Sequence, residues 1–155
     1  MPELTIVEGQ LDDPRVVALV TRHTTNARAV LPDGAGHAFS VDGLKATNIR
    51  FWSAWLNGDV VGIGALKTLS TELGEVKSMH TTSAARGQGV ADQLLSHIEL
   101  NARSAGLSQL GLETHPGPYF APAIALYVKH GFSECPPFGD YVLDPNSMFM
   151  TKTLD

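Results

Sequence analysis

A short glycine-containing stretch is the part of this sequence best suited to bind a charged ligand. It reads Arg86-Gly87-Gln88-Gly89-Val90-Ala91. The glycines let a ligand approach the backbone closely, and Arg86 can add a charge-assisted hydrogen bond. If a helix begins after the loop, the unpaired N–H groups of its first turn and the positive end of its dipole attract phosphate. We therefore expect the loop to bind the phosphates of a ligand.

Two other phosphate-binding motifs do not fit. The P-loop needs Gly-Lys-Ser/Thr after a four-residue gap, and the chain has no such string. The dinucleotide fingerprint could begin at Gly62-Ile63-Gly64, but Lys67 stands in place of the third glycine and the segment continues as a strand.

Cysteine and histidine chemistry is not indicated by spacing. Cys135 is the only cysteine, so no internal disulfide or cysteine metal cage can form. It precedes two prolines and has no His–Asp arrangement beside it, which argues against a nucleophilic thiol. The six histidines lack H-x-x-x-H or similar spacing, and we expect no metal.

The loop at Arg86 is predicted to lie between a strand and a helix. A strand is expected at about 74–81, and the helix after the loop ends at Gly106. Its apolar residues are Val90, Leu94, Leu95, Ile98 and Leu100. This order would place the loop at a helix N-terminus.

Upstream, the sequence predicts a strand at 4–7, a helix and a hairpin. Asp12-Asp13-Pro14 supplies a cap and a first-turn proline. The helix has one buried stripe, formed by Val16, Val17, Leu19, Val20, Ala27 and Val30. Asn57-Gly58-Asp59 joins strands at 49–56 and 60–69. Residues 31–44 are too long for a simple connection, so we expect them to be mobile or functional.

Downstream, the elements alternate again. A strand is expected at 109–114, followed by a helix from about 121 to 130 that Gly131 ends. A short strand begins at Phe132, residues 136–140 form a loop, and 147–154 is the last strand.

Composition is that of one ordinary domain covering residues 1–155. The chain is 43% hydrophobic, its net charge is -5, and its eleven basic residues are scattered, which argues against a nucleic-acid partner. No apolar run approaches the roughly 20 residues that span a bilayer, and the first residues lack a secretory signal. We expect a cytoplasmic protein with no membrane contact.

Two segments together resemble a known family. The stretch from Glu75 to Ala91 is similar to motif A of the GNAT acetyltransferases, Gln/Arg-x-x-Gly-x-Gly/Ala, which Arg86, Gly89 and Ala91 match. The stretch from Ala123 to Phe132 is similar to motif B, a helix with Leu-Tyr followed by Gly-Phe. The chain most resembles small uncharacterised bacterial members. The resemblance implies an α/β (α+β) fold with a mixed, mostly antiparallel sheet flanked by helices.

The resemblance also implies an activity. Family members transfer the acetyl group of acetyl-CoA directly to an amine, here that of a small-molecule or amino-acid-like acceptor. The residues that would bind the coenzyme are Met79, His80, Thr81, Arg86, Gly87, Gln88, Gly89, Val90, Ala91, Glu113, Phe120, Ala123 and Tyr127. Many members have an asparagine where this chain has Phe120, so the usual contact with the pantetheine arm must be replaced or absent.

Direct transfer needs a proton donor and a base. The resemblance implies that the Tyr127 hydroxyl protonates the departing thiolate. Glu75 is the candidate base, because several members place a glutamate early on this strand. A period of two would put Glu75, Lys77 and Met79 on one face. His80 and His115 are alternative bases near the strand ends.

Acceptor specificity is expected in two loops, 31–44 and 136–146. Their candidate contacts are His37, Phe39, Asp140, Tyr141 and Asp144. A silent acyl-CoA-binding module and a protein or peptide amine acetyltransferase are the alternative functions. Exposed edge strands would also allow a homodimer.

Overall fold

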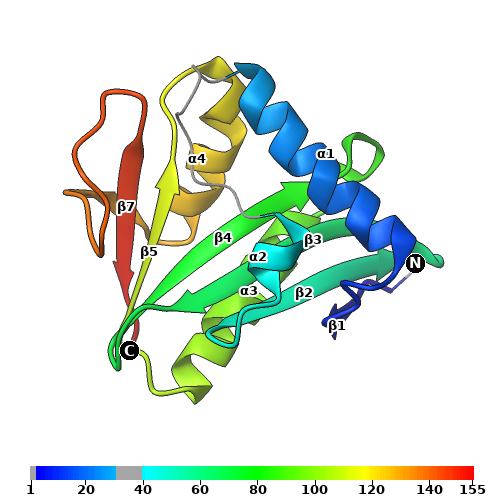
Figure 1. Ribbon diagram of the computed structural model, residues 1–155, viewed down its shortest axis with the longest axis horizontal. Coiled ribbons are helices and arrows are strands. Elements are labelled where there is room, and N and C mark those ends of the chain that lie inside the picture. Colours follow the sequence, from blue (N-terminus) through cyan, green and yellow to red (C-terminus); the bar gives the residue numbers. More distant parts are fainter. Residues whose placement is uncertain (1–2, 31–39) are drawn as a thin grey trace.

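The computed structural model describes residues 3–30 and 40–155. These residues form a seven-stranded sheet in the order β1-β2-β3-β4-β5-β7-β6, flanked by helices (Figure 1). The strands are β1 (Thr5–Glu8), β2 (Ile49–Leu56), β3 (Asp59–Thr68), β4 (Leu73–Thr81), β5 (Gln109–Thr114), β6 (Ser133–Cys135) and β7 (Met148–Thr153). The α-helices are α1 (Pro14–Val30), α2 (Val41–Leu44), α3 (Val90–Ser104) and α4 (Ala121–Lys129). Two 3-10 turns, η1 (Ser83–Ala85) and η2 (Pro118–Phe120), precede α3 and α4.

The sheet is mixed and mostly antiparallel, as the sequence predicted. Among the strands of residues 3–30 and 40–155, only β4 and β5 pair in parallel, from Leu73 opposite Gln109 to Val76 opposite Leu112. Beyond that point the two strands no longer pair with each other, although β4 continues to Thr81 beside β3 and β5 to Thr114 beside β7. The sheet therefore splits between β4 and β5, which opens a space at their carboxyl ends.

Helices cover both faces of the sheet. In Figure 1, α1 and α2 cross in front of the sheet and α3 lies behind it. Leu94, Leu95 and Ile98 of α3 pack with Trp52 and Leu66 in one apolar cluster. A second cluster holds α1 and α2 against β2 and β3, and consists of Val16, Leu19, Val20, Leu44, Phe51, Ile63 and Ala65. Val76 belongs to the α3 cluster, so its neighbours Glu75 and Lys77 project toward the α1 face.

Local signals explain several element ends. The side chain of Asp13 accepts a hydrogen bond from the backbone N–H of Arg15 at 2.9 Å, which caps α1. Asn57 and Gly58 both have positive φ angles, as a two-residue hairpin turn requires. Gly106, with φ 84°, ends α3 in the left-handed conformation.

A bulge in β4 changes which side chains share a face. His80 lies opposite Ile63, but Lys77 lies opposite Ala65, so β4 has one residue more than β3 in this interval. Ser78 has φ 59°, the left-handed conformation. The prediction that Met79 shares a face with Glu75 is therefore wrong: Met79 packs into the α3 cluster, and His80 reaches α1 instead.

Most of the expected elements are confirmed, with small differences. The predicted stripe of α1 is wrong at its end, because Val30 is 47% exposed and Thr24 is buried. Leu100 of α3 is 60% exposed, because it lies on the side of the helix away from the sheet. No helix in residues 3–30 and 40–155 is long and apolar enough to span a bilayer.

Candidate functional site

A cavity of about 690 Å³ begins where β4 and β5 part. Its walls come from α1, from β4, from the loop at Arg86 with the start of α3, from the end of β5, and from α4. It contains every residue predicted to bind the coenzyme except Gln88: Met79, His80, Thr81, Arg86, Gly87, Gly89, Val90, Ala91, Glu113, Phe120, Ala123 and Tyr127. Glu75 and His115 line it as well.

The loop at Arg86 has the geometry of an anion site. Gly89 is the residue before the first turn of α3, and both it and Gly87 have φ 79°. A Cβ at either glycine would meet no atom within 4 Å, so conformation rather than crowding favours glycine there. The first N–H groups of α3 face the loop and remain available to a ligand. Arg86, Gly87, Gly89, Val90 and Ala91 all line the cavity, which suits a phosphate group.

Gln88 does not line the cavity. Its side-chain amide donates a hydrogen bond to the carbonyl oxygen of Ala84 at 3.2 Å, which directs it back onto the preceding turn. Its contribution to a ligand is therefore limited to its backbone.

Tyr127 lines the cavity from α4 and is 7% exposed. Its ring packs edge-on against Phe132, with 5.9 Å between ring centroids. Burial raises the pKa of the hydroxyl to about 12, because the phenolate would lose its hydration. At neutral pH Tyr127 therefore carries its proton and can donate it.

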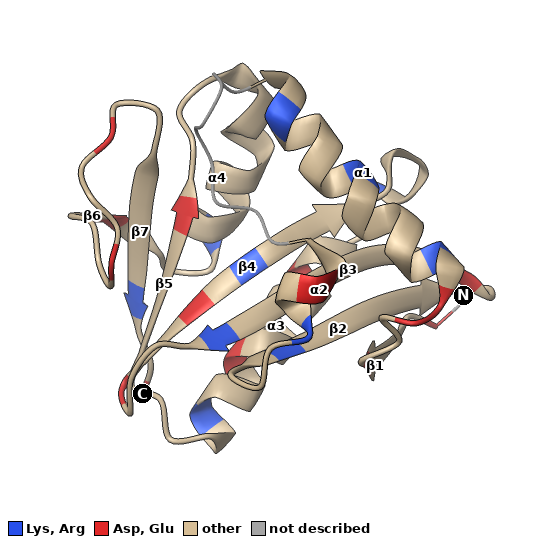
Figure 2. Ribbon diagram, viewed as in Figure 1, with Lys and Arg blue, Asp and Glu red and all other residues tan. Residues whose placement is uncertain are grey.

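Glu75 is held by two neighbours. Its Oε2 accepts a hydrogen bond from the Tyr141 hydroxyl at 2.6 Å and another from Lys77 Nζ at 3.3 Å. Lys77 Nζ also donates to the Tyr141 hydroxyl oxygen at 3.0 Å. Glu75 is only 2% exposed, and Lys77 is also buried. In Figure 2 the acidic and basic bands that follow one another along β4 belong to this pair.

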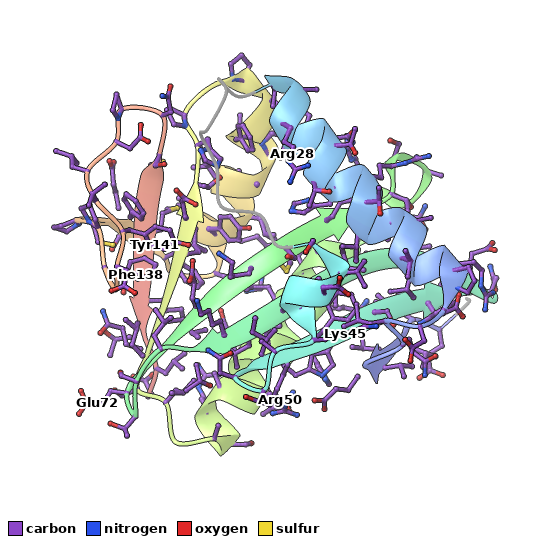
Figure 3. All side chains as sticks on the ribbon, in the orientation of Figure 1. Arg28, Lys45, Arg50, Glu72, Phe138 and Tyr141 are labelled. Atoms are coloured by element: carbon purple, nitrogen blue, oxygen red, sulfur yellow. The ribbon has the colours of Figure 1, made fainter. Side chains whose placement is uncertain are left out.

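Tyr141 comes from the loop between β6 and β7, which lies over β5. Figure 3 shows Phe138 and Tyr141 beside β5 and β7. A Cβ at Gly111 of β5 would come within 2.8 Å of the Phe138 ring, so the absent side chain at Gly111 makes room for Phe138. Burial first, and then its hydrogen bond to Glu75, raise the pKa of Tyr141 well above its usual range. The Tyr141 hydroxyl consequently stays a donor to Glu75.

Two histidines meet across the cavity wall. His23 of α1 and His80 of β4 have their Nδ1 atoms 3.2 Å apart. Burial is the main cause that lowers the pKa of both to about 4. The nearby His80 lowers the pKa of His23 further, and the charges of Arg86 and Arg22 lower that of His80. Both rings are therefore neutral at pH 7, with one Nδ1 donating to the other.

His115 is buried at the end of β5. Its Nδ1 lies 2.6 Å from the carbonyl oxygen of Asn146, which can only accept, so Nδ1 carries the proton. Nε2 is then an acceptor in the neutral ring. The ring centroids of Phe120 and His115 lie 4.9 Å apart. Phe120 lines the cavity at the position where many members of the family that the sequence resembles have an asparagine.

The other acceptor candidates separate into three groups. His37 and Phe39 lie outside the described residues. Asp140 and Asp144 do not line the cavity, and Asp144 instead accepts a hydrogen bond from the Asn146 N–H at 2.8 Å within its own turn. Tyr141 contacts the site through Glu75.

Sequence reasoning missed three residues of α1. His23, Ala27 and Arg28 line the cavity, although only Ala27 was singled out, and that as part of the core stripe. His23 and Ala27, four residues apart, share one side of the helix, but no local pattern shows that this side faces β4.

Comparisons with known proteins agree with this geometry. A family model described as an acetyltransferase (GNAT) domain matches residues 47–134. The chain is 44% identical over 140 residues to the uncharacterized N-acetyltransferase YsnE of Bacillus subtilis, covering 90% of this chain and 93% of that protein. The chain belongs to the GNAT acetyltransferase family.

Other acetyltransferases extend the likeness over nearly the whole chain. The IAA acetyltransferase of Azospirillum brasilense is 43% identical over 157 residues, which cover 99% of this chain and all of that protein. A crystal structure of an acetyltransferase from Streptococcus agalactiae has a TM-score of 0.77 at 21% identity, and covers 97% of this chain and 98% of its own, which shows the shared fold.

Membership settles the reaction class. The protein is an acyltransferase, and the family implies acetyl-CoA as its co-substrate. The residues present fit the diphosphate of that molecule, since positive-φ glycines, Arg86 and an open helix N-terminus meet at one end of the cavity.

Proposed function

We propose that this GNAT protein transfers the acetyl group of acetyl-CoA to the amine of a small-molecule or amino-acid-like acceptor. The observation that carries the proposal is the cavity itself. The loop at Arg86, Tyr127 and Glu75 lie on its walls, so an anion site, a proton donor and a carboxylate open onto one space.

Arg86 and the first turn of α3 would hold the diphosphate. The wall from Met79 to Thr81 on one side and from Phe120 to Ala123 on the other would hold the arm that carries the thioester. Phe120 offers an apolar surface there rather than an amide. The aromatic contact between Phe120 and His115 supports that position of the ring.

We propose Glu75 as the base, acting through a water molecule. An aliphatic ammonium has a pKa near ~10 and cannot attack until it loses a proton. Glu75 takes that proton, the neutral nitrogen forms a bond to the thioester carbon, and the carbon–sulfur bond breaks. Tyr127 protonates the departing thiolate, and the second proton lost by the nitrogen replaces the one that Tyr127 gave. One proton is released to water overall.

His80 and His115 are the alternative bases. Both line the cavity. The Nδ1 atom of His80 lies beside that of His23, and Nδ1 of His115 lies beside the Asn146 carbonyl oxygen. Variants Glu75→Gln, His80→Gln and His115→Gln, compared by kcat at one pH, distinguish the three. The proposal requires the largest fall in kcat in Glu75→Gln, and an equal or larger fall in either histidine variant would contradict it.

The function is tested by following free thiol release from acetyl-CoA. The acceptor panel should contain small amines, the twenty amino acids and peptides, and a thermal-shift titration with coenzyme A should accompany it. We expect stabilisation by coenzyme A and thiol release with a small amine or amino acid. Stabilisation without release on any acceptor would favour a silent acyl-CoA-binding module, and release with peptides alone would favour a protein or peptide acetyltransferase.

A further inference from the structure

Each acidic side chain that lines the cavity has a hydrogen-bond or ion-pair partner. The acids are Glu75, Asp92 and Glu113, and each has its own partner. Tyr141 and Lys77 bond to Glu75, and the Ser147 hydroxyl donates to Glu113 at 2.8 Å. Asp92 lies 2.9 Å from Lys129 Nζ and 3.0 Å from His130 Nε2. No acid on the wall is therefore without a partner.

Only some of the cationic side chains that line the cavity have an ion-pair partner among residues 3–30 and 40–155. Lys77 pairs with Glu75, and Lys129 pairs with Asp92. Arg28 and Arg86 also line the cavity, and neither makes an ion pair with residues 3–30 or 40–155. Both side chains are exposed, so water solvates their charges. The diphosphate expected at the start of α3 accounts for Arg86 and leaves Arg28.

Arg28 lies on the other face of the sheet. It belongs to the last turn of α1, which crosses in front of the sheet, whereas the loop at Arg86 leads into α3 behind it (Figure 1). Figure 3 labels Arg28 on the side of α1 toward α4. Glu75 and Lys77 project toward this same face. An anion at Arg28 would therefore lie on the face of the sheet toward which Glu75, the proposed base, projects.

We propose that Arg28 binds the carboxylate of the acceptor, so that the acceptor is an aminocarboxylic acid rather than a simple amine. This rests on the proposed acetyl transfer. A guanidinium presents two parallel N–H donors that match a carboxylate, and it remains charged at every working pH. His23 and Ala27, its cavity-lining neighbours on α1, add no competing charge, because His23 is neutral at pH 7 and Ala27 is apolar.

The test compares acceptors that differ only in the carboxylate. Each amino acid acetylated by the wild-type protein is assayed beside its carboxamide and its decarboxylated amine. We expect kcat/KM to fall by about tenfold to a hundredfold when the carboxylate is removed, which is the usual effect of losing a hydrogen bond to a charged group. Arg28→Gln should produce the same fall for the amino acid and little change for the amine, and Arg28→Lys should restore part of it.

Arg22→Gln is the matched control. Arg22 is exposed on the same helix but does not line the cavity, so its acceptor KM should remain that of the wild type. Dephospho-CoA separates the other source of an anion. If Arg28→Gln raises the KM of acetyl-CoA, Arg28 binds the coenzyme and the proposal is wrong; loss of that effect with the acetyl thioester of dephospho-CoA would assign the contact to the 3′-phosphate.

Other outcomes separate this proposal from the function on which it rests. Equal rates with an amino acid and its decarboxylated amine, or release with amines but with no amino acid, would overturn the carboxylate site and leave acetyl transfer intact. No thiol release with any acceptor would overturn the transfer itself.

Discussion

At the level of single side chains, two tyrosines near the cavity differ in position and contacts. Tyr127 lines the wall directly, and burial raises its pKa to about 12. Tyr141 does not line the wall but donates to Glu75 at 2.6 Å. We therefore treat Tyr127 as the proposed proton donor and Tyr141 as a positioning residue for Glu75.

Replacing Tyr127 by phenylalanine should remove the donor without creating a cavity. We expect kcat to fall by about a hundredfold or more, the usual size of a general-acid contribution. The shift in melting temperature caused by coenzyme A should stay within error of the wild type, because the ring and its contact with Phe132 are kept. An unchanged kcat would contradict the donor assignment.

Tyr141→Phe should leave Glu75 with Lys77 as its remaining bonded neighbour among the described residues. Losing a hydrogen bond to a buried charged group should lower the free energy of unfolding by about 1–3 kcal/mol, measured by urea titration. The kcat should fall as well, since Glu75 loses the contact that orients it. Phe138→Leu is the control: it keeps the hydroxyl–Glu75 bond, so a kcat as low as that of Tyr141→Phe would show that loop packing, not the bond, matters.

The N-terminus of α3 is the element on which the proposed diphosphate site depends. Its first turn provides N–H groups only if the chain enters the helix through a left-handed residue, and Gly89 supplies this with φ 79°. The strand before the loop, β4, is held by its pairing with β3, and the helix after it, α3, is held by its apolar cluster. These two anchors fix both ends of the short loop between them.

Gly89→Ala tests this entry. An L-residue in the left-handed conformation costs about 1–2 kcal/mol, so the free energy of unfolding should fall by that amount. Coenzyme A should also bind more weakly, measured by calorimetric titration, because relaxation of the strain moves the donors. Gly106→Ala has the same kind of strain, φ 84°, at the other end of α3 and outside the cavity. It should lose similar stability and keep the wild-type affinity.

At the scale of the whole molecule, two distant segments bring neutral histidines together. His23 and His80 are 57 residues apart in the chain, and only the packing of α1 on the sheet places their rings in contact. Their arrangement links stability to pH, because the folded protein holds both with a pKa of about 4, well below the ordinary value of 6.5.

The sign of this pH effect follows from proton uptake. Between pH 6.5 and about 4 the unfolded chain binds protons at both histidines and the folded protein does not, so stability is full above pH 6.5 and declines toward pH 4. Carboxylates whose pKa is lowered, such as Asp92, lose their contribution at still lower pH. Urea unfolding at pH 7, 6 and 5 should show the decline, and His23→Gln should reduce it. A free energy of unfolding that is constant across this range would contradict it.

Local patterns were enough to predict the order of the strands and of α1, α3 and α4, but not α2, which lies in the segment 31–44 that was expected to be a loop. The hairpin at Asn57-Gly58, the bounds of β5 and the end of α3 at Gly106 depend on residues close in the chain, and these predictions are confirmed. The loop at Arg86 was recognisable for the same reason, since its glycines, its arginine and the helix that follows lie within a few residues.

Contacts between distant segments could be decided only by the tertiary structure. The bulge at Ser78 depends on how β4 pairs with β3, and it exchanges the faces of Met79 and His80, which a strict period of two cannot anticipate. Tyr141 meets Glu75 across 66 residues, and the turn of α1 that carries Arg28 joins the cavity because an apolar stripe anchors the helix to the sheet. The sequence by itself indicated the family and its reaction class, because motifs are local; packing decided which side chains line the cavity.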